Sequence, residues 1–194
     1  MNIMEKHLRI IRHLAGYFIG TAVFIFLIPL GFWWLSLSRY PVFRIQVIPD
    51  DGLRLMVSLL IFVPGMIFVV WSNLYLLVQG KEGPVDAAGI RISPRTKKLV
   101  RQGPYKLTRN PMVFGIQTVY ISVSVFLNSL GCLGISLLFF HIIVRYVVAA
   151  EEVRLFNDFG SAYLRYKEKT PRIMPLSGQL LKKLAEKFRP RAGK

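Results

Sequence analysis

The feature that most constrains this chain is a run of 35 residues, Asn110 to Val144, with no Lys, Arg, Asp or Glu. A helix needs about 20 apolar residues to cross a bilayer, so the run is too long for one span and suits two. Asn128, Ser129 and Gly131 lie near its middle, where a turn would fall. The run predicts a membrane hairpin whose two ends both open onto charged segments.

Two further stretches, Leu14 to Leu37 and Leu55 to Val78, also lack ionised side chains and are long enough to span with some tilt. We therefore predict an all-α, polytopic membrane helical bundle that forms a single domain over residues 1–194. The expected segments are spans at about 14–37, 55–78, 111–127 and 131–149, a loop at 79–110 and a tail at 150–194. A fifth span is compatible with the pattern if Pro29 or Pro64 breaks a helix into re-entrant halves.

The distribution of positive charge orients this topology. Of the 26 Lys and Arg residues, 23 fall in the termini and the 79–110 loop, and only Arg39, Arg44 and Arg54 fall on the other side. Cytoplasmic loops collect Lys and Arg, so we place both termini and the loop in the cytoplasm. Topology and attraction to anionic lipid headgroups account for the net charge of +16, and nucleic-acid binding is not needed to explain it.

Composition excludes several kinds of site. The single cysteine, Cys132, rules out an internal disulfide or a thiolate metal cluster, and the three histidines are scattered. We expect no metal site. The loop and the tail are each too short for a soluble domain of usual size, so any cofactor must bind to the membrane helices and their loops.

The charged segment before the hairpin, RQGPYKLTRNP, has a clear local logic. Asn110 and Pro111 predict a helix start, with the Asn side chain as N-cap and Pro at the first helical position. Arg109 would lie beside the free N–H groups of that helix, which favour an anion. A turn at 103–104 would direct Tyr105 back toward this end. The alternative is a capped helix after a positive-inside loop, with no ligand.

The segment after the hairpin, RYVVAAEEVRLFNDFGSAYLRY, places Glu151 and Glu152 at the cytoplasmic end of the fourth span. Uncompensated carboxylates are costly there. Arg145, seven residues before Glu152, would share its helical face and lies deeper than the other basic residues of the tail. Tyr163 and Tyr166 would share a face of the next helix. The alternative is an interfacial aromatic belt with an ordinary ion pair.

Together, LVRQGPYKLTRNPMVFG and EEVRLFNDFGSAYLRYKEKTP resemble the isoprenylcysteine carboxyl methyltransferase family, which is related to the membrane phospholipid methyltransferases. The resemblance covers about Leu99 to Pro175. The positions that match the family pattern are Gly103, Tyr105, Arg109, Pro111, Glu151, Glu152, Leu155, Phe159, Gly160, Tyr163 and Tyr166. Asn110 stands where the family usually has His, and Val113 where it usually has Tyr.

The resemblance implies S-adenosyl-L-methionine as methyl donor, with S-adenosyl-L-homocysteine as product. Arg109 and the helix start suit its carboxylate, Glu151 or Glu152 its ammonium or ribose hydroxyls, and the ring of Tyr105 or Tyr163 its sulfonium. The expected cofactor-binding residues are Leu99, Val100, Gly103, Tyr105, Arg109, Asn110, Pro111, Met112, Val113, Glu151 and Tyr163.

The acceptor implied by the resemblance is a lipophilic carboxylate of the prenylcysteine type, which would enter between the helices. A carboxylate is already ionised at neutral pH and needs only a cation to place it, for which Arg145 and Arg172 are the candidates. A phospholipid amine would instead need a proton acceptor, for which Glu152 could serve. A third hypothesis is a non-catalytic lipid carrier or channel, which would have no affinity for the donor.

Two further expectations concern packing. The tail from Leu180 alternates apolar and basic residues with helical period, which predicts an amphipathic helix on the membrane surface. Gly115, Gly131 and Gly134 would permit close approach between helices.

Overall fold

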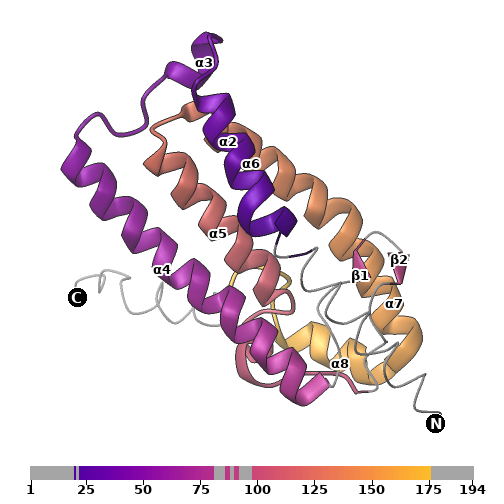
Figure 1. Cartoon of the computed structure of the whole chain (residues 1–194). Helices are drawn as coiled ribbons and strands as arrows, with labels where there is room; N and C mark the ends of the chain where they lie inside the picture. Colours follow the sequence, from indigo (N-terminus) through magenta and orange to yellow (C-terminus); the bar gives the residue numbers. More distant parts are fainter. Residues whose placement is uncertain (1–19, 21, 81–85, 88–89, 92–97, 176–194) are drawn as a thin grey trace, which may run out of the picture.

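Long helices packed side by side form the body of the molecule (Figure 1). The computed structural model describes residues 20, 22–80, 86–87, 90–91 and 98–175. The elements in chain order are η1 (Ala22–Leu27), α2 (Ile28–Ser36), α3 (Pro41–Arg44), α4 (Asp51–Tyr75), η2 (Leu76–Gly80), β1 (Asp86–Ala87), β2 (Ile90–Arg91), η3 (Gly103–Lys106), α5 (Pro111–Phe126), α6 (Leu130–Ile142), η4 (Ile143–Val148), α7 (Ala149–Phe159) and α8 (Ser161–Lys169). The two strands pair antiparallel over two residues each.

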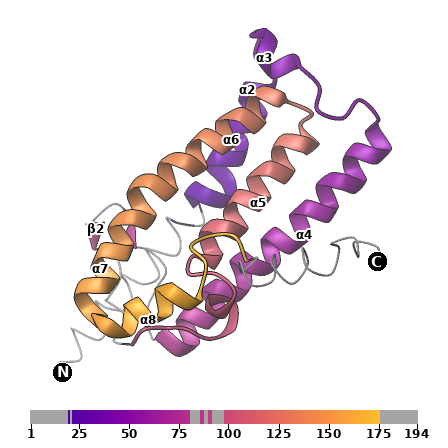
Figure 2. The ribbon, with the colours of Figure 1, turned by 180° about the vertical axis from the view of Figure 1, so that it is seen from behind.

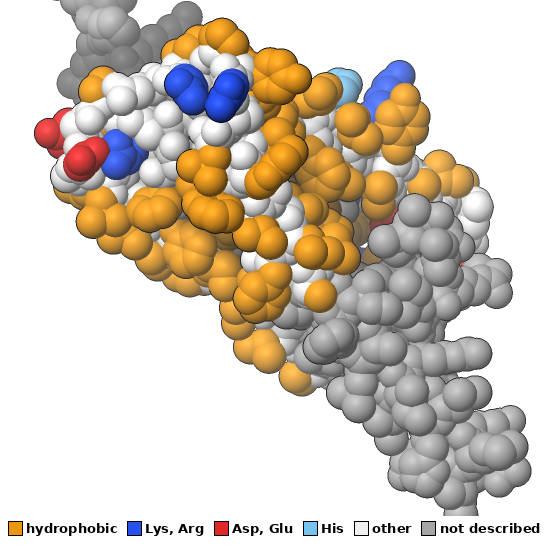
Figure 3. Space-filling model, turned by 45° about the horizontal axis from the view of Figure 1, so that its top comes forward, with side chains coloured by type: hydrophobic (Ala, Val, Ile, Leu, Met, Phe, Trp, Pro, Cys, Tyr) orange, Lys and Arg blue, Asp and Glu red, His pale blue; other side chains and the backbone are white. Residues whose placement is uncertain are grey.

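Two of the described helices are long and apolar enough to cross a membrane. They are α4, with 25 residues, and the continuous helix Leu130–Phe159 of α6, η4 and α7, with 30 residues. Two shorter apolar helices, Ala22–Ser36 and Pro111–Phe126, pack beside them. Figure 3 shows hydrophobic side chains spread over this bundle, with few charged side chains among them.

The helices of the structure differ in extent from the predicted spans. The second helix begins at Asp51, four residues before the prediction, because Asp50 caps it: its Oδ1 accepts from the Leu53 N–H at 2.6 Å. The last apolar helix continues to Phe159 rather than ending near residue 149. The first helix is described from Ala22, so the predicted start of that span at Leu14 lies outside the described residues.

Proline breaks neither of the first two long helices in the described chain. Pro64 lies inside α4, which continues on both sides of it. Pro29 lies where the π-helical turn η1 passes into α2, and the helix Ala22–Ser36 continues through it. The described residues therefore contain no re-entrant halves at these positions.

The predicted hairpin turn is confirmed between α5 and α6. Asn128 adopts a left-handed backbone conformation, with φ of 54°, which Asn tolerates better than most residues. Its Oδ1 accepts from the N–H groups of Val47 and Ile48 at 2.8 and 2.9 Å. Ser129 caps α6 by accepting from the Cys132 N–H. The turn thus also fixes the segment that follows α3.

The closest helix packing lies between α4 and α5, where two glycines face each other. A Cβ on Gly115 would lie 2.8 Å from the Gly65 carbonyl oxygen, so the predicted close approach at Gly115 is confirmed. Gly131 faces the ring of Phe43 in the short helix α3 rather than a long helix. Among the described residues a Cβ on Gly134 would meet no atom within 4 Å, so the predicted close approach is not found there.

The helix α2 completes the bundle by packing on α5 and α6. Phe32 meets the ring of Tyr120 edge to face at 5.6 Å, and Cys132 is fully buried beside them. The Tyr120 hydroxyl donates to the Phe24 carbonyl at 3.0 Å, which satisfies its polar end. The amphipathic C-terminal helix predicted from Leu180 lies outside the described residues.

Candidate active site

The approach to α5 is a tight turn that only glycine fits. Gly103 has φ of +59°, and a Cβ there would lie 2.6 Å from the ring of Tyr75 on α4. The turn continues as η3 and directs the Tyr105 carbonyl toward α8, where the Tyr166 hydroxyl donates to it at 2.6 Å. The predicted turn at 103–104 is therefore present, and it joins the loop before α5 to the helix after α7.

Arg109 lies at the centre of the contacts at this end of the bundle. Its guanidinium forms an ion pair with Glu152 of α7 at 2.7 Å and donates to the Tyr163 hydroxyl of α8 at 3.0 Å. Its Nε donates to the Thr170 carbonyl at 3.1 Å. The side chain is 8% exposed. Residues that the two sequence motifs contribute separately are thus brought together on one arginine.

Glu152 attracts two more cations. Arg172 lies 3.3 Å and Lys167 4.0 Å from its carboxylate oxygens, and their side chains are more exposed than Arg109. We call the group Arg109, Glu152, Tyr163, Lys167 and Arg172 the Glu152 cluster. Three positive charges surround one negative charge, so the cluster retains positive charge that suits an anionic ligand.

Tyr163 and Tyr166 lie on one buried face of α8, with ring centroids 6.3 Å apart. Gly160, at φ of 51°, separates α7 from α8 and lets that face turn toward the cluster. Burial raises the pKa of Tyr163, the charge of Glu152 raises it further, and Arg109 opposes both. Burial is also the main cause that raises the pKa of Tyr166. Both phenols therefore stay neutral at physiological pH.

Two predicted site residues point away from the cluster. Glu151 pairs with Arg154 one turn along α7, so the adjacent glutamates have different partners. Arg145 is exposed and joins none of the ion pairs among the described residues. It lies in the π-helical turn η4, whose wider winding shifts the register. A spacing of seven residues therefore does not place Arg145 against Glu152.

Asn110 occupies the predicted position before α5 but does not act as predicted. Helix α5 begins at Pro111, as expected, yet the Asn110 side chain makes no capping hydrogen bond. Its Nδ2 donates instead to the Arg172 carbonyl at 2.9 Å. The reason is that the segment after α8 runs back to the start of α5, as Figure 2 shows, and brings an uncapped carbonyl within reach.

The remaining predicted residues lie near the same end. Leu99 and Val100 are half-buried in the segment before the turn, Pro111 is buried, and Met112 and Val113 are half-buried in the first turn of α5. Sequence reasoning missed Thr108, Lys167 and Thr170. Lys167 had a signal, since it lies one helical turn after Tyr163. The two threonines had none, because their roles depend on the path of the chain after α8.

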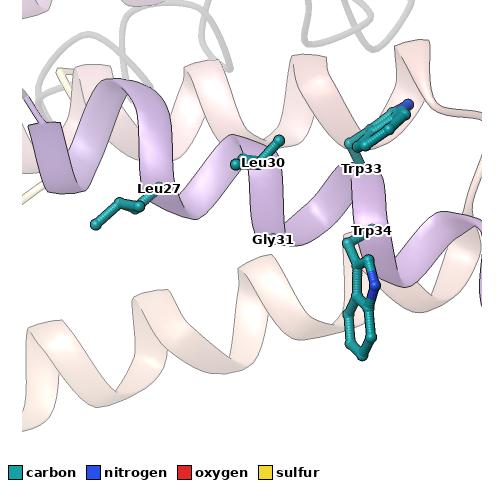
Figure 4. Close-up of a pocket in the computed structure, with 5 residues that line it drawn as sticks. All are labelled: Leu27, Leu30, Gly31, Trp33 and Trp34. Carbon is teal, nitrogen blue, oxygen red and sulfur yellow. The ribbon is translucent and has the colours of Figure 1, made fainter.

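A shallow apolar depression lies elsewhere, on the outer side of α2 (Figure 4). It is lined by Leu27, Leu30, Gly31, Trp33 and Trp34. None of these lining residues is charged, so the depression offers no partner for a charged ligand, and it is not part of the Glu152 cluster. Among the described residues no three His, Cys, Asp or Glu side chains gather as metal ligands.

Comparison with known families identifies the class of protein as a membrane methyltransferase. The model of the phospholipid methyltransferase family matches residues 53–162, more than half of the chain. The chain belongs to this family, which is related to the isoprenylcysteine carboxyl methyltransferases and whose methyltransferases use S-adenosylmethionine. Searches of curated proteins and of solved structures found no significant match.

The matched range includes Arg109 and Glu152, the ion pair that joins the two motifs. It ends before Tyr163, Lys167 and Arg172, which the structure adds to the same cluster. The family and the two long apolar helices together indicate an integral membrane protein.

Proposed function

We propose that this protein is an S-adenosylmethionine-dependent methyltransferase that methylates a lipid-like acceptor at the cytoplasmic face of a membrane. The observation that carries the proposal is the Glu152 cluster, in which a buried Arg109–Glu152 ion pair joins the start of α5 to α7 and α8. Four spans, with both termini in the cytoplasm, would place this cluster at the inner membrane surface. That topology rests on the apolar segments and on the distribution of Lys and Arg.

The start of α5 suits the carboxylate of the donor. Because the Asn110 side chain does not cap the helix, the first-turn N–H groups of Met112 and Val113 meet no side-chain acceptor among the described residues. Free N–H groups and the helix dipole favour an anion there. Arg109 adds positive charge beside them, and the backbone of Leu99 and Val100 is proposed to line the same site.

The donor, when bound, supplies a methyl group on a positively charged sulfur. The neutral phenol of Tyr163, held by Arg109, and the ring of Tyr105 are the aromatic groups proposed to face that charge. The role of the cluster is to orient the reactants and exclude water, since in-line transfer depends mainly on alignment. Glu152 would keep the arginines in place.

The charge of the cluster favours an anionic acceptor. A carboxylate, as in a prenylated cysteine, needs no proton acceptor and would be placed by Arg172, whose side chain is 37% exposed. Arg172 is preferred to Arg145 for this role, because Arg145 joins none of the cluster's ion pairs among the described residues. Methylation of a carboxylate fits the observation that the single carboxylate of the cluster, Glu152, is engaged by Arg109 and Arg172.

A second candidate is methylation of a phospholipid amine, which the family description favours. An amine loses a proton on methylation and requires a base. Within the cluster only Glu152 could accept it, and the reaction would require that carboxylate to leave at least one arginine. Activity would then fall as the pH is lowered, whereas carboxylate methylation would change little over the neutral range.

Carboxylate methylation and amine methylation can be distinguished by the bond that each forms, an O-methyl ester or an N-methyl bond. Purified protein in detergent is given methyl-labelled S-adenosylmethionine with either an S-prenylated cysteine or phosphatidylethanolamine, and the extracted product is treated with base. A methyl ester releases labelled methanol, whereas an N-methyl group does not. Base-labile product from the prenylated cysteine supports the proposal, and label only in phosphatidylethanolamine supports the second candidate.

Site assignment is tested in the same assay by two neighbouring variants. Glu152→Gln removes the carboxylate that holds Arg109 and Arg172, and we expect a large loss of turnover. Glu151→Gln is the matched control, because Glu151 pairs with Arg154 outside the cluster, and we expect a smaller effect. Equal turnover of Glu152→Gln and wild type would refute the site.

A further inference from the structure

Three successive backbone carbonyls after α8 accept hydrogen bonds from the segment before α5. The Thr170 carbonyl accepts from Arg109 Nε at 3.1 Å, and the Pro171 carbonyl accepts from the Arg109 N–H at 2.9 Å. The Arg172 carbonyl accepts twice, from Thr108 Oγ1 at 3.2 Å and from Asn110 Nδ2 at 2.9 Å. Residues about 60 positions apart are therefore joined along a continuous line of contacts.

These backbone contacts are buried, whereas the Arg172 side chain is partly exposed. Thr108 is fully buried, and Thr170 and Ile173 are 7% and 8% exposed. The Arg172 side chain is 37% exposed, although its Nε lies 3.3 Å from Glu152. The backbone of this segment is thus held inside the protein while the Arg172 guanidinium extends to the surface beside the cluster.

Asn110 is the side chain whose role this geometry explains. It does not cap α5, so its amide is used for the Arg172 carbonyl alone among the described contacts. A carbonyl oxygen can only accept, so the residue at position 110 must donate. Asn and His both carry an N–H that can do so, and His is the residue usual at this position in the pattern that the sequence resembles.

We propose that Asn110 and Thr108 are positioning residues that clamp the Arg172 carbonyl and so hold the Arg172 guanidinium where the anionic group of the methyl acceptor binds. The inference rests on the proposed function for the identity of the ligand. The clamp itself rests on hydrogen bonds that are independent of any ligand. Loss of the clamp should weaken acceptor binding more than it affects the donor.

The test compares three variants of the full-length protein in detergent. Asn110→Leu keeps the branched shape of the side chain and removes the donor, whereas Asn110→His retains one. Asn128→Leu is the matched control, because it removes a hydrogen-bonding Asn in the distant hairpin turn. Each protein is assayed for KM and kcat with the acceptor that the wild type uses, an S-prenylated cysteine or phosphatidylethanolamine, both of which carry an anion.

We expect Asn110→Leu to raise the KM for the acceptor by about tenfold, the effect of leaving a buried carbonyl short of a donor, with a smaller change in affinity for S-adenosylhomocysteine. Asn110→His should restore the KM to near the wild-type value. Asn128→Leu should lower thermal stability and leave the KM unchanged. If it raises the KM as much as Asn110→Leu does, the effect is one of general destabilisation and the proposal is overturned.

Hydrogen exchange makes the clamp testable without activity. The Arg109 N–H that bonds to the Pro171 carbonyl should exchange faster in Asn110→Leu than in wild type or Asn110→His. Unchanged exchange would overturn the clamp. If Asn110→Leu does not fold, Thr108→Val, which removes the other donor at constant shape, is measured in its place.

Failure of the proposed function gives a different result. A wild-type protein that binds no S-adenosylhomocysteine and methylates neither acceptor would refute the methyltransferase assignment, while the hydrogen-exchange comparison would still decide whether Asn110 holds the Arg172 segment.

Discussion

Replacement of Gly115 by alanine tests the packing that positions the candidate site. The added Cβ would lie 2.8 Å from the Gly65 carbonyl oxygen and 2.8 Å from the Val69 nitrogen. Both are backbone atoms, so no side-chain rotation relieves the contact and α5 must move relative to α4. Gly134→Ala is the matched control, because no atom of the described residues lies within 4 Å of the corresponding Cβ position.

The expected magnitudes have opposite sign at the two glycines. Overpacking of a core costs about 1–3 kcal/mol, whereas Gly to Ala in a helix gains up to about 1 kcal/mol from propensity. The free energy of unfolding should therefore fall by roughly 1–2 kcal/mol in Gly115→Ala, and it should be unchanged or slightly higher in Gly134→Ala. For a chain of this length each kcal/mol corresponds to about 2–4 °C in Tm, which predicts a separation of several degrees.

The chain provides its own reporter for this assay. Cys132 is the only cysteine and is fully buried, so a thiol-reactive fluorophore labels the protein only as it unfolds. Gly115 also lies five residues after Asn110, and a shift of α5 should weaken the affinity for S-adenosylhomocysteine. Equal Tm values for the two variants, or a higher Tm for Gly115→Ala, would refute the reasoning.

Three further predictions concern other parts of the fold. The raised pKa of Tyr166 means that the folded state holds the phenolic proton more tightly than the unfolded state does. The stability that Tyr166 contributes is therefore complete below about pH 10 and is lost as the pH rises through the folded pKa. In alkali, the Tm of Tyr166→Phe should fall less steeply with pH than that of the wild type. Asp50→Ala removes the side chain that caps α4 by accepting from the Leu53 N–H, and it should lower the free energy of unfolding by about 0.5–2 kcal/mol. The same thiol assay measures this change, with Asp51→Ala for comparison. The new thiols of Lys106→Cys and Arg39→Cys should react with an impermeant thiol reagent from opposite sides of an intact membrane, and labelling of both from one side would contradict the proposed topology.

Much of the fold is predictable because it follows from local patterns. The uncharged run predicts the hairpin, Asn128 and Ser129 mark its turn, and Pro111 marks the start of α5. Helix ends are less predictable, since a span that passes from lipid into water need not stop at the boundary. The last apolar helix thus continues to Phe159, where Gly160 ends it.

The candidate site is predictable in its residue types and less so in its pairings. The two motifs supply Arg109, Glu152 and Tyr163, which the structure brings together. Which of two adjacent glutamates faces the arginine depends on the helical register, and the π-helical turn η4 changes that register upstream. Backbone acceptors leave no trace in side-chain patterns, so the sequence does not predict the contacts of Asn110 and Thr108 with the Arg172 carbonyl.

Calorimetric titration of the purified protein with S-adenosylhomocysteine tests the central claim most directly, because it requires no knowledge of the acceptor. We predict saturable one-to-one binding in the wild type and in Glu151→Gln, and strongly weakened binding in Arg109→Ala and Glu152→Gln, each shown by the Cys132 assay to be folded. Absence of binding to folded wild-type protein would contradict the methyltransferase assignment and favour a lipid carrier or channel. Undiminished binding in both cluster variants would place the donor site elsewhere.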